Sequence, residues 1–163
     1  KDSLSLSSIA HLADIQIDST GRAPDEFRKE LLSRLQLPSQ DDVLLTIQSF
    51  SYKKGLPASA DYVFDMRFLN NPHWQVNLRE KTGLDEGVRS FVEGDPLFYA
   101  FMERVTGLIA DTLPSQTGDS RPNITVAFGC TGGKHRSVVS AQWFARWAKA
   151  KALPASVYHH EVS

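Results

Sequence analysis

The segment around residue 130 constrains the fold more than any other. A short apolar run, Ile124 to Phe128, leads directly into the loop Gly129-Cys130-Thr131-Gly132-Gly133-Lys134-His135-Arg136-Ser137. An unbroken apolar run of this length is typical of a strand buried on both faces of a sheet. Apolar side chains then recur at helical spacing and predict a helix from about 134 to 151, with Val138, Ala141, Ala145 and Ala148 inward. The sequence therefore predicts an α/β fold, an open mixed sheet flanked by helices, with a glycine-rich loop between a central strand and a helix.

Further elements are expected on both sides of this segment. Residues 43–52 and 61–68 read as strands joined by a turn at 54–57, and residues 157–159 as a last short strand. A short helix is expected after Asp85, with Val88, Phe91 and Val92 inward. A longer helix is expected from Asp95-Pro96, because aspartate and proline favour a helix start. Its apolar stripe would be Leu97, Phe101, Val105, Leu108, Ile109 and Leu113, and residues 114–122 would form a polar loop.

The N-terminal residues have a different organisation. Residues 12–18 alternate like a strand, residues 24–36 have helical periodicity, and residues 37–42 have the composition of a linker. This strand and helix cannot bury both of their faces alone, so residues 1–40 are predicted to be the end of a preceding domain plus a linker. Residues 41–163 would form the second domain. Because the first residue is Lys1, we expect an excerpt or a processed product.

Composition excludes several classes of protein. The net charge of −1 argues against gross electrostatic adhesion to nucleic acid or membrane, and no stretch has the roughly 20 apolar residues of a membrane span. A single cysteine cannot form a disulfide framework, which is expected of a reducing, cytoplasmic setting. Cys130 alone cannot build a thiolate zinc site, and His159 and His160 lack a third ligand, so no metal is expected.

The glycine-rich loop has the features of an anion site. Glycines allow a tight turn in which backbone amides converge on one oxyanion, and the start of the helix adds free N–H groups and the positive end of its dipole. Lys134 contributes a point charge, and Arg136 can bind two phosphate oxygens at once. The alternative is a tight turn with solvated basic residues. The Walker A spacing is absent, so neither a nucleotide cofactor nor nucleotide hydrolysis is expected of this chain alone.

A second interpretation of the same loop is enzymatic. Cys130, Arg136 and Ser137 match Cys-x5-Arg-Ser/Thr, the short signature of cysteine-dependent phosphatases, in which a thiolate attacks phosphorus. Such enzymes usually have a histidine before the cysteine, where this chain has Gly129. They also need an acid on another loop, and the candidates are Asp65, Asp85 and Asp95. We therefore expect a binding loop with no catalytic residue, with Cys130 packed beneath it.

A second group of polar residues follows another predicted strand. Asp65 and Arg67 lie two residues apart near the carboxyl end of the strand, and His73 follows on an irregular segment. Ligands of open α/β sheets bind beside the carboxyl ends of strands, so these side chains are expected near the glycine-rich loop. The alternative is a salt-bridged pair with an ordinary hydrogen-bonded histidine.

These segments resemble a known family. The stretches 49–57, 60–69, 71–74 and 82–85, the pair Leu78-Arg79, and the glycine-rich loop 129–137 are closely similar to the RapZ/YvcJ family, which includes the RNase adapter protein and nucleotide-binding relatives. The resemblance covers about residues 41–160 as the family's C-terminal domain. The segment before Leu37 looks like the end of the family's N-terminal P-loop domain, the only part in which ATP or GTP would be expected.

The resemblance implies a concrete function. It implies a regulatory domain that binds a phosphorylated amino sugar, glucosamine-6-phosphate, acts as an adapter for small regulatory RNA or a protein partner, and assembles as a homo-oligomer. The implied pocket residues are Asp65, His73, Thr131, Gly132 and Arg136, with Arg67, Cys130, Gly133, Lys134, His135 and Ser137 beside them. The RNA-binding branch resembles a chain with a basic tail, whereas residues 158–163 contain no lysine or arginine. An RNA-binding module without a small ligand is the remaining alternative.

Overall fold

The computed structural model describes residues 43–117 and 123–163. The predicted strand at 12–18, the helix at 24–36, the linker at 37–42 and the proposed domain division after residue 40 lie outside these ranges. Within them, no helix is both long and apolar enough to cross a lipid bilayer.

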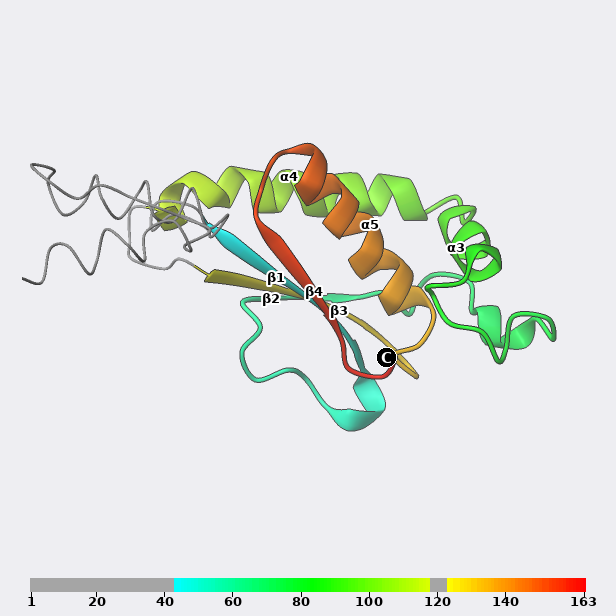
Figure 1. Ribbon diagram of the computed structural model, residues 1–163. Coiled ribbons are helices and arrows are strands. Elements are labelled where there is room, and N and C mark those ends of the chain that lie inside the picture. Colours follow the sequence, from blue (N-terminus) through cyan, green and yellow to red (C-terminus); the bar gives the residue numbers. More distant parts are fainter. Residues whose placement is uncertain (1–42, 118–122) are drawn as a thin grey trace, which may run out of the picture. The chain divides into compact units, whose positions relative to one another are not determined.

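Within the described residues, four strands form one open sheet in the order β2-β3-β1-β4 (Figure 1). Their bounds are Leu44–Ser51 for β1, Tyr62–Asp65 for β2, Asn123–Cys130 for β3 and Ala155–His159 for β4. Every pairing is parallel, with β3 and β4 on either side of β1 and β2 beside β3. The predicted α/β class is confirmed, but the expected mixed sheet is wrong in detail. Each connection carries the chain back to the same edge of the sheet before the next strand starts, and that return makes neighbouring strands parallel.

In the part of the chain that the structure describes, three α-helices connect the strands: α3 at Glu86–Glu93, α4 at Phe98–Thr117 and α5 at Arg136–Ala150. Two short 3-10 helices, η2 at Tyr52–Lys54 and η3 at Pro72–Trp74, follow β1 and β2. The loop predicted from residue 114 starts too early, because α4 continues through Pro114 to Thr117. Pro114 removes one backbone donor from the helix, and α4 ends within one turn after it.

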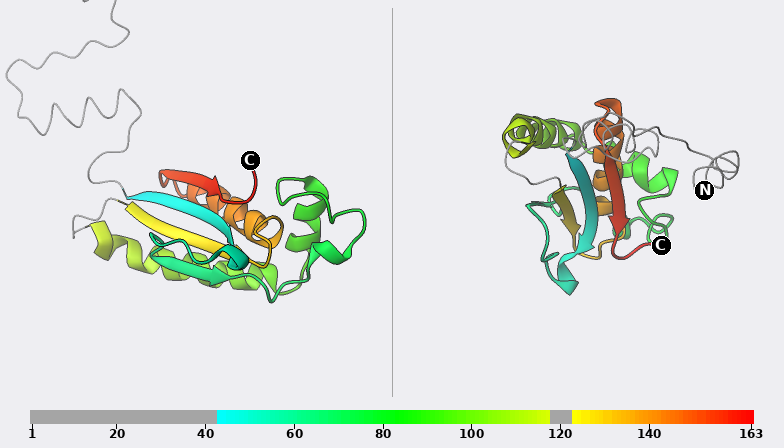
Figure 2. Two further views of the ribbon diagram at one scale, coloured as in Figure 1. Left: turned by 90° about the horizontal axis from the view of Figure 1, so that it is seen from below. Right: turned by 60° about the vertical axis from the view of Figure 1, so that its left-hand side comes forward.

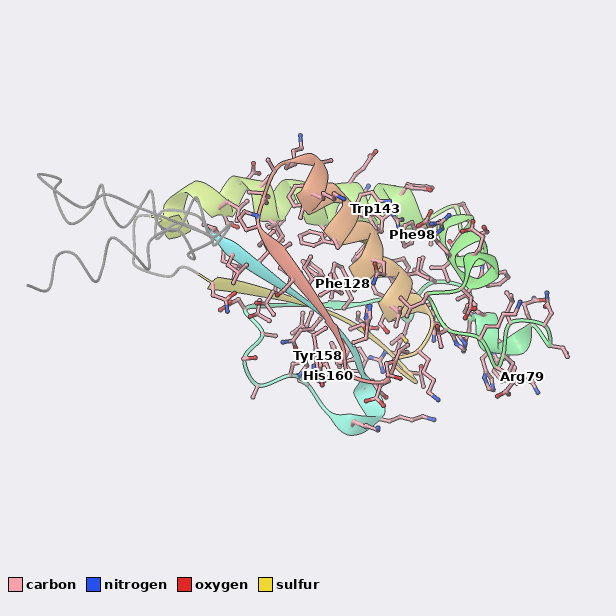
Figure 3. The ribbon with its side chains drawn as sticks, in the orientation of Figure 1. Arg79, Phe98, Phe128, Trp143, Tyr158 and His160 are labelled. Atoms are coloured by element: carbon pink, nitrogen blue, oxygen red, sulfur yellow. The ribbon has the colours of Figure 1, made fainter. Side chains whose placement is uncertain are left out.

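The core lies between the sheet and the helices (Figures 2 and 3). Alternate residues of β1 and β3 supply the sheet side: Leu45, Ile47, Ile124, Val126 and Phe128, all with no exposed surface. Helix α4 supplies Phe98, Met102, Val105 and Ile109, and α5 supplies Val139, Ala141, Phe144 and Ala148. Because a parallel sheet requires long connections, its helices cover a sheet face and bury these side chains.

The predicted apolar stripe of α4 is partly wrong. Leu97 and Leu108 are 56% and 49% exposed, whereas Phe98 and Ile109 are fully buried. The stripe begins at Phe98, whose ring packs edge-on against Trp143 of α5 with 6.2 Å between ring centroids. Leucine is apolar enough to occupy either face, so hydrophobicity alone did not fix the rotation of this helix.

The parallel strands all end at the same edge of the sheet, where α5 begins (Figure 1). The chain leaves β1 toward β2 at one side of the sheet, and leaves β3 through α5 toward β4 at the other. Connections that diverge from two adjacent strands leave a crevice beside their carboxyl ends. The candidate site lies at this position.

Candidate phosphate-binding pocket

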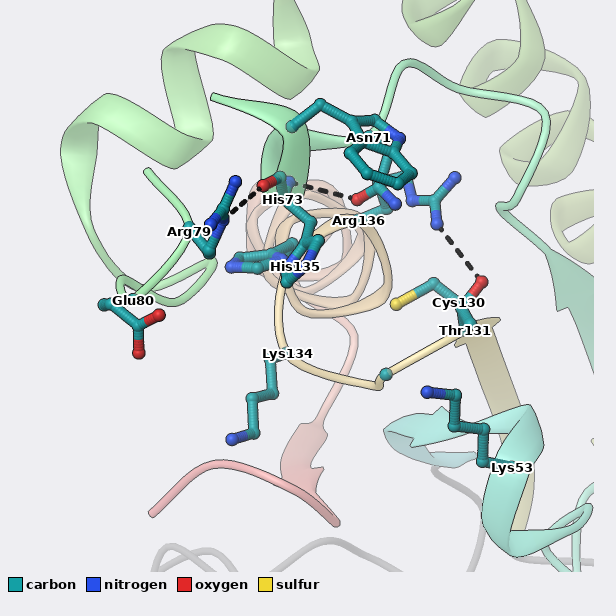
Figure 4. A pocket seen from close by; sticks show the side chains of 12 residues that line it. Lys53, Asn71, His73, Arg79, Glu80, Cys130, Thr131, Lys134, His135 and Arg136 are labelled. Atoms are coloured by element: carbon teal, nitrogen blue, oxygen red, sulfur yellow. Dashed lines mark hydrogen bonds between the residues drawn. The ribbon is translucent and has the colours of Figure 1, made fainter. Parts of the chain in front are cut away.

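A cavity of about 420 Å³ opens at the carboxyl edge of the sheet (Figure 4). Three segments that are distant in sequence contribute to it, because they lie at the ends of three neighbouring strands: Lys53 after β1, residues from within 71–80 after β2, and residues from within 130–136 at and beyond the end of β3. The lining residues are Lys53, Asn71, His73, Trp74, Arg79, Glu80, Cys130, Thr131, Gly132, Lys134, His135 and Arg136.

The glycine-rich loop forms the floor of this cavity. Gly133 has φ +69°, a conformation that glycine adopts without strain. Two hydrogen bonds to loop carbonyls fix the loop, from the Gly83 amide to the Lys134 oxygen (2.8 Å) and from the Ser51 hydroxyl to the Thr131 oxygen (2.7 Å). Within the described residues, the amides of Gly132, Gly133 and Lys134 donate to no protein acceptor. These N–H groups precede the start of α5, where no side chain caps the helix, and both features favour an anion.

Arg136 is the first residue of α5 and is only 5% exposed. Its Nη1 donates to the carbonyl oxygens of Arg67 (2.8 Å) and Leu69 (3.0 Å), and its Nη2 lies 3.4 Å from the Thr131 hydroxyl. Its Nε is also buried and makes no hydrogen bond within the described part of the chain. Burial lowers the pKa of Arg136 from its usual value, although nothing brings a guanidinium near neutrality at pH 7. The structure therefore fixes one cation at the cavity wall, with a buried Nε that has no acceptor among the described residues.

Positive charge predominates around the cavity. Figure 4 shows Lys53, Arg79, Lys134 and Arg136 around the opening, and Glu80 is the one carboxylate among the described residues that line it. Arg79 is oriented by a hydrogen bond from its Nε to the carbonyl oxygen of His73 (3.0 Å). Cations at the wall of a partly enclosed cavity attract anions more strongly than they would on an open surface.

His135 is the histidine that the fold restrains most strongly in the cavity wall. Its Nε2 lies 2.7 Å from the carbonyl oxygen of Lys81, and a carbonyl only accepts, so Nε2 carries the hydrogen. Burial lowers the pKa of His135 below its usual value, partly offset by that carbonyl, while nearby His73 lowers it further. A neutral His135 at pH 7 follows from this environment.

The predicted pair of Asp65 and Arg67 is not among the lining residues. Their ion pair is short, 2.6 Å from Arg67 Nη2 to Asp65 Oδ2, and both side chains are nearly half exposed. The guanidinium of Arg67 lies 4.0 Å from the centre of the Tyr52 ring. Hydrogen bonds from Arg67 hold the pKa of Asp65 below its usual range. The negative charge of Asp65 is thus already compensated by Arg67, and neither side chain lines the cavity.

Two other predicted residues of the loop, Ser137 and Gly133, are buried and do not line the cavity. The Oγ of Ser137 is 3.2 Å from the Sγ of Cys130, and both residues are buried. Gly133 is also buried, because the backbone of β1 packs directly against it. The remaining predicted residues line the cavity together: His73, Cys130, Thr131, Gly132, Lys134, His135 and Arg136.

Comparison with known proteins identifies the family. Residues 43–163 match the model of the RapZ C-terminal domain. This chain belongs to the RapZ family. A nucleotide-binding protein of Xanthomonas oryzae pv. oryzae is 41% identical over 91% of the chain and 53% of its own length, and one of Xanthomonas campestris pv. campestris is 40% identical over the same shares. A nucleotide-binding protein of Paramagnetospirillum magneticum is 38% identical over 96% of the chain and 51% of its own length. The chain thus spans about half the length of these relatives.

The matched RapZ domain contains five lining residues that sequence reasoning did not select: Lys53, Asn71, Trp74, Arg79 and Glu80. Four of them lie within the stretches that resembled the family, so the signal was present in the sequence. Glu80 lies outside those stretches. Its position in the cavity depends on the return of the chain after η3 and could not be read from local pattern.

Proposed function

We propose that this RapZ-family domain binds a phosphorylated amino sugar of the glucosamine-6-phosphate type, and that binding regulates an RNA or protein partner of the whole protein. The observation that carries the proposal is Arg136. Among the described residues, it is a buried guanidinium whose Nε makes no hydrogen bond, and it lies at the wall of a cavity whose floor is a glycine-rich loop with amides that donate to no protein acceptor. A phosphate group supplies the acceptors that this arrangement lacks.

The rest of the cavity supports a small polar ligand. A volume of about 420 Å³ lies within the range of small-molecule sites. The exposed ring of Trp74 offers an apolar surface to a sugar ring, and Asn71 offers a polar side chain for hydroxyl groups. An amino sugar adds a cation, and Glu80 provides a carboxylate within the lining, whereas Asp65 is already paired with Arg67.

The geometry favours binding over phosphatase chemistry. A Cys-x5-Arg phosphatase needs a carboxylic acid that can protonate the leaving group, and each predicted candidate is engaged elsewhere. Asp65 pairs with Arg67, Asp85 accepts from the amide of Thr82 (2.7 Å), and buried Asp95 accepts from the amides of Asn70 (2.9 Å) and Leu97 (3.0 Å). None of the three lines the cavity.

The cavity also favours a small ligand over RNA as the direct occupant of this site. Its cations surround a concave opening, and the chain as a whole has a net charge of −1. RNA binding through phosphates requires a more extended basic surface. In our proposal, the RNA or protein partner responds to the liganded domain in a homo-oligomer, and does not enter the pocket.

Calorimetric titration tests the proposal. Glucosamine-6-phosphate should bind more tightly than glucose-6-phosphate, and both more tightly than inorganic phosphate, with glucosamine as the control that lacks the anion. Binding of glucosamine as tight as that of its phosphate would contradict the proposal. Aryl-phosphate hydrolysis should be absent at pH 5 to 8, and turnover that is lost in Cys130→Ser would favour the phosphatase instead.

A further inference from the structure

Residues 160–163, which follow β4, form the C-terminal segment. Through Glu161, this segment lies against the back of the glycine-rich loop (Figure 1). After β4, the amide of His160 donates to the carbonyl oxygen of Ser49 (3.0 Å), which continues the attachment of this segment to β1. The next residue, Glu161, is outside the cavity but its side chain is only 9% exposed. A carboxylate with so little contact with water needs a partner.

That partner is Lys54, at the end of η2. Its Nζ lies 2.6 Å from Glu161 Oε2, while the lysine side chain itself remains 70% exposed. The preceding residue, Lys53, lines the cavity. The ion pair therefore joins the C-terminal segment to the short helix that carries one of the cavity's cations.

Glu161 also contacts the loop directly. A Cβ added to Gly133 would lie 2.5 Å from Glu161 Cγ and 2.8 Å from the Ser51 amide nitrogen. The side chain of Glu161 and the end of β1 thus enclose Gly133 from behind, and the adjacent residues 132 and 134 line the cavity. Movement of Glu161 would leave the turn at Gly133 unsupported on one side.

We propose that Glu161 is a positioning residue for the phosphate-binding loop, so that the C-terminal segment sets the affinity of the pocket through Gly133. The inference rests on the proposed function, because it concerns regulation of the same site. It assigns to Glu161 an effect on ligand binding without contact with the ligand. A partner that moves the C-terminal segment would thereby weaken phosphate binding, and phosphate binding would equally oppose that movement.

Electrostatics alone predicts the opposite result. Glu161 is a negative charge near an anion site, so its neutralisation in Glu161→Gln would strengthen phosphate binding if charge were all that mattered. Loss of loop support weakens binding instead. Weaker phosphate binding in Glu161→Gln therefore indicates that Glu161 positions the loop, and tighter binding indicates that only its charge matters.

The experiment measures affinity for inorganic phosphate and glucosamine-6-phosphate by calorimetry in wild type, Glu161→Gln and the control Glu103→Gln, which removes the same charge from the exposed side of α4. We expect Glu161→Gln to weaken binding of both ligands about threefold to tenfold, and Glu103→Gln to leave it unchanged. Unchanged or tighter binding in Glu161→Gln would overturn the inference. If wild type binds neither ligand, the proposed function fails first.

A second measurement does not depend on the ligand. The backbone amide resonances of Gly132 and Gly133 report the loop conformation in the unliganded protein. Both should shift in Glu161→Gln and in Lys54→Ala, the latter an exposed substitution that leaves the core intact, and neither should shift in Glu103→Gln. Unperturbed glycine resonances in the first two variants would rule out positioning, whatever the affinities show.

Discussion

Gly132 and Gly133 are adjacent in one loop, but the structure leaves room for a side chain only at Gly132. At Gly133, φ is +69° and an added Cβ would lie 2.5 Å from Glu161 Cγ, whereas no heavy atom lies within 4 Å of a Cβ added at Gly132. The left-handed backbone costs a non-glycine residue about 1–2 kcal/mol before any steric contact is counted. Only one of the two glycines is therefore required by the fold.

We predict that Gly133→Ala lowers the free energy of unfolding by about 2 kcal/mol or more. Gly132→Ala, the matched control, should change it by less than about 0.5 kcal/mol. Urea denaturation of the unliganded protein measures both. Similar losses in the two variants would show that the loop conformation does not depend on Gly133.

Arg136 and Lys53 both line the cavity but differ in burial. We predict that Arg136→Ala weakens glucosamine-6-phosphate binding tenfold or more, because a hydrogen bond to a charged group is worth about 1.5–3 kcal/mol. It should also lower the melting temperature, since the carbonyl oxygens of Arg67 and Leu69 lose their donor. Lys53→Ala should weaken binding less and leave the melting temperature unchanged. Equal effects of the two substitutions on affinity would indicate that only net charge matters.

At the scale of elements, packing determines which face of α4 is buried. Leu108 and Ile109 are adjacent apolar residues, yet one is 49% exposed and the other has no exposed surface. We predict that Ile109→Ala lowers the free energy of unfolding by about 2–5 kcal/mol, because it leaves a cavity in the core. Leu108→Ala should change it by less than about 0.5 kcal/mol. Thermal or urea denaturation distinguishes the two, and a reversed order would mean that α4 is rotated relative to the structure.

At the scale of the whole molecule, two histidines link folding to pH. Burial lowers the pKa of both His135 and His159 below the usual 6.5. The rings are fixed by hydrogen bonds, His135 to Lys81 as described, and His159 through Nδ1 to the Ser49 hydroxyl (2.7 Å) and through Nε2 to the Gln142 amide nitrogen (2.9 Å). Below pH 6.5 these two histidines therefore bind protons more readily in the unfolded chain than in the folded chain.

The contribution of these histidines to the free energy of unfolding is therefore largest above pH 6.5. It falls as the pH drops below 6.5, by up to about 1.4 kcal/mol per pH unit for each histidine. Asp65, whose pKa is lowered by Arg67, affects the pH dependence of stability only at more acidic pH. We predict this decline in denaturant titrations of the unliganded protein between pH 8 and 5.5. It should become shallower in His159→Gln, and a stability that rises toward pH 5.5 would contradict the assignment of neutral buried rings.

The sequence by itself determined the features that depend on near neighbours. The apolar run at 124–128, the glycines after it and the helical spacing beyond predicted a strand, a turn and a helix, because each pattern satisfies local backbone and burial requirements. The cationic character of the loop was equally local, since Lys134 and Arg136 follow the glycines directly. Similarity in these same stretches identified the family.

Only the tertiary structure decided which side chains share the cavity. Lys53, Arg79 and Glu80 meet the glycine-rich loop because they follow strands that end at the same edge of a parallel sheet, and strand order is not encoded in any short segment. Asp65 is instead neutralised by Arg67, whose amide and side chain both donate to its carboxylate. The parallel direction of all strands and the buried face of α4 were settled in the same way, by packing between distant segments.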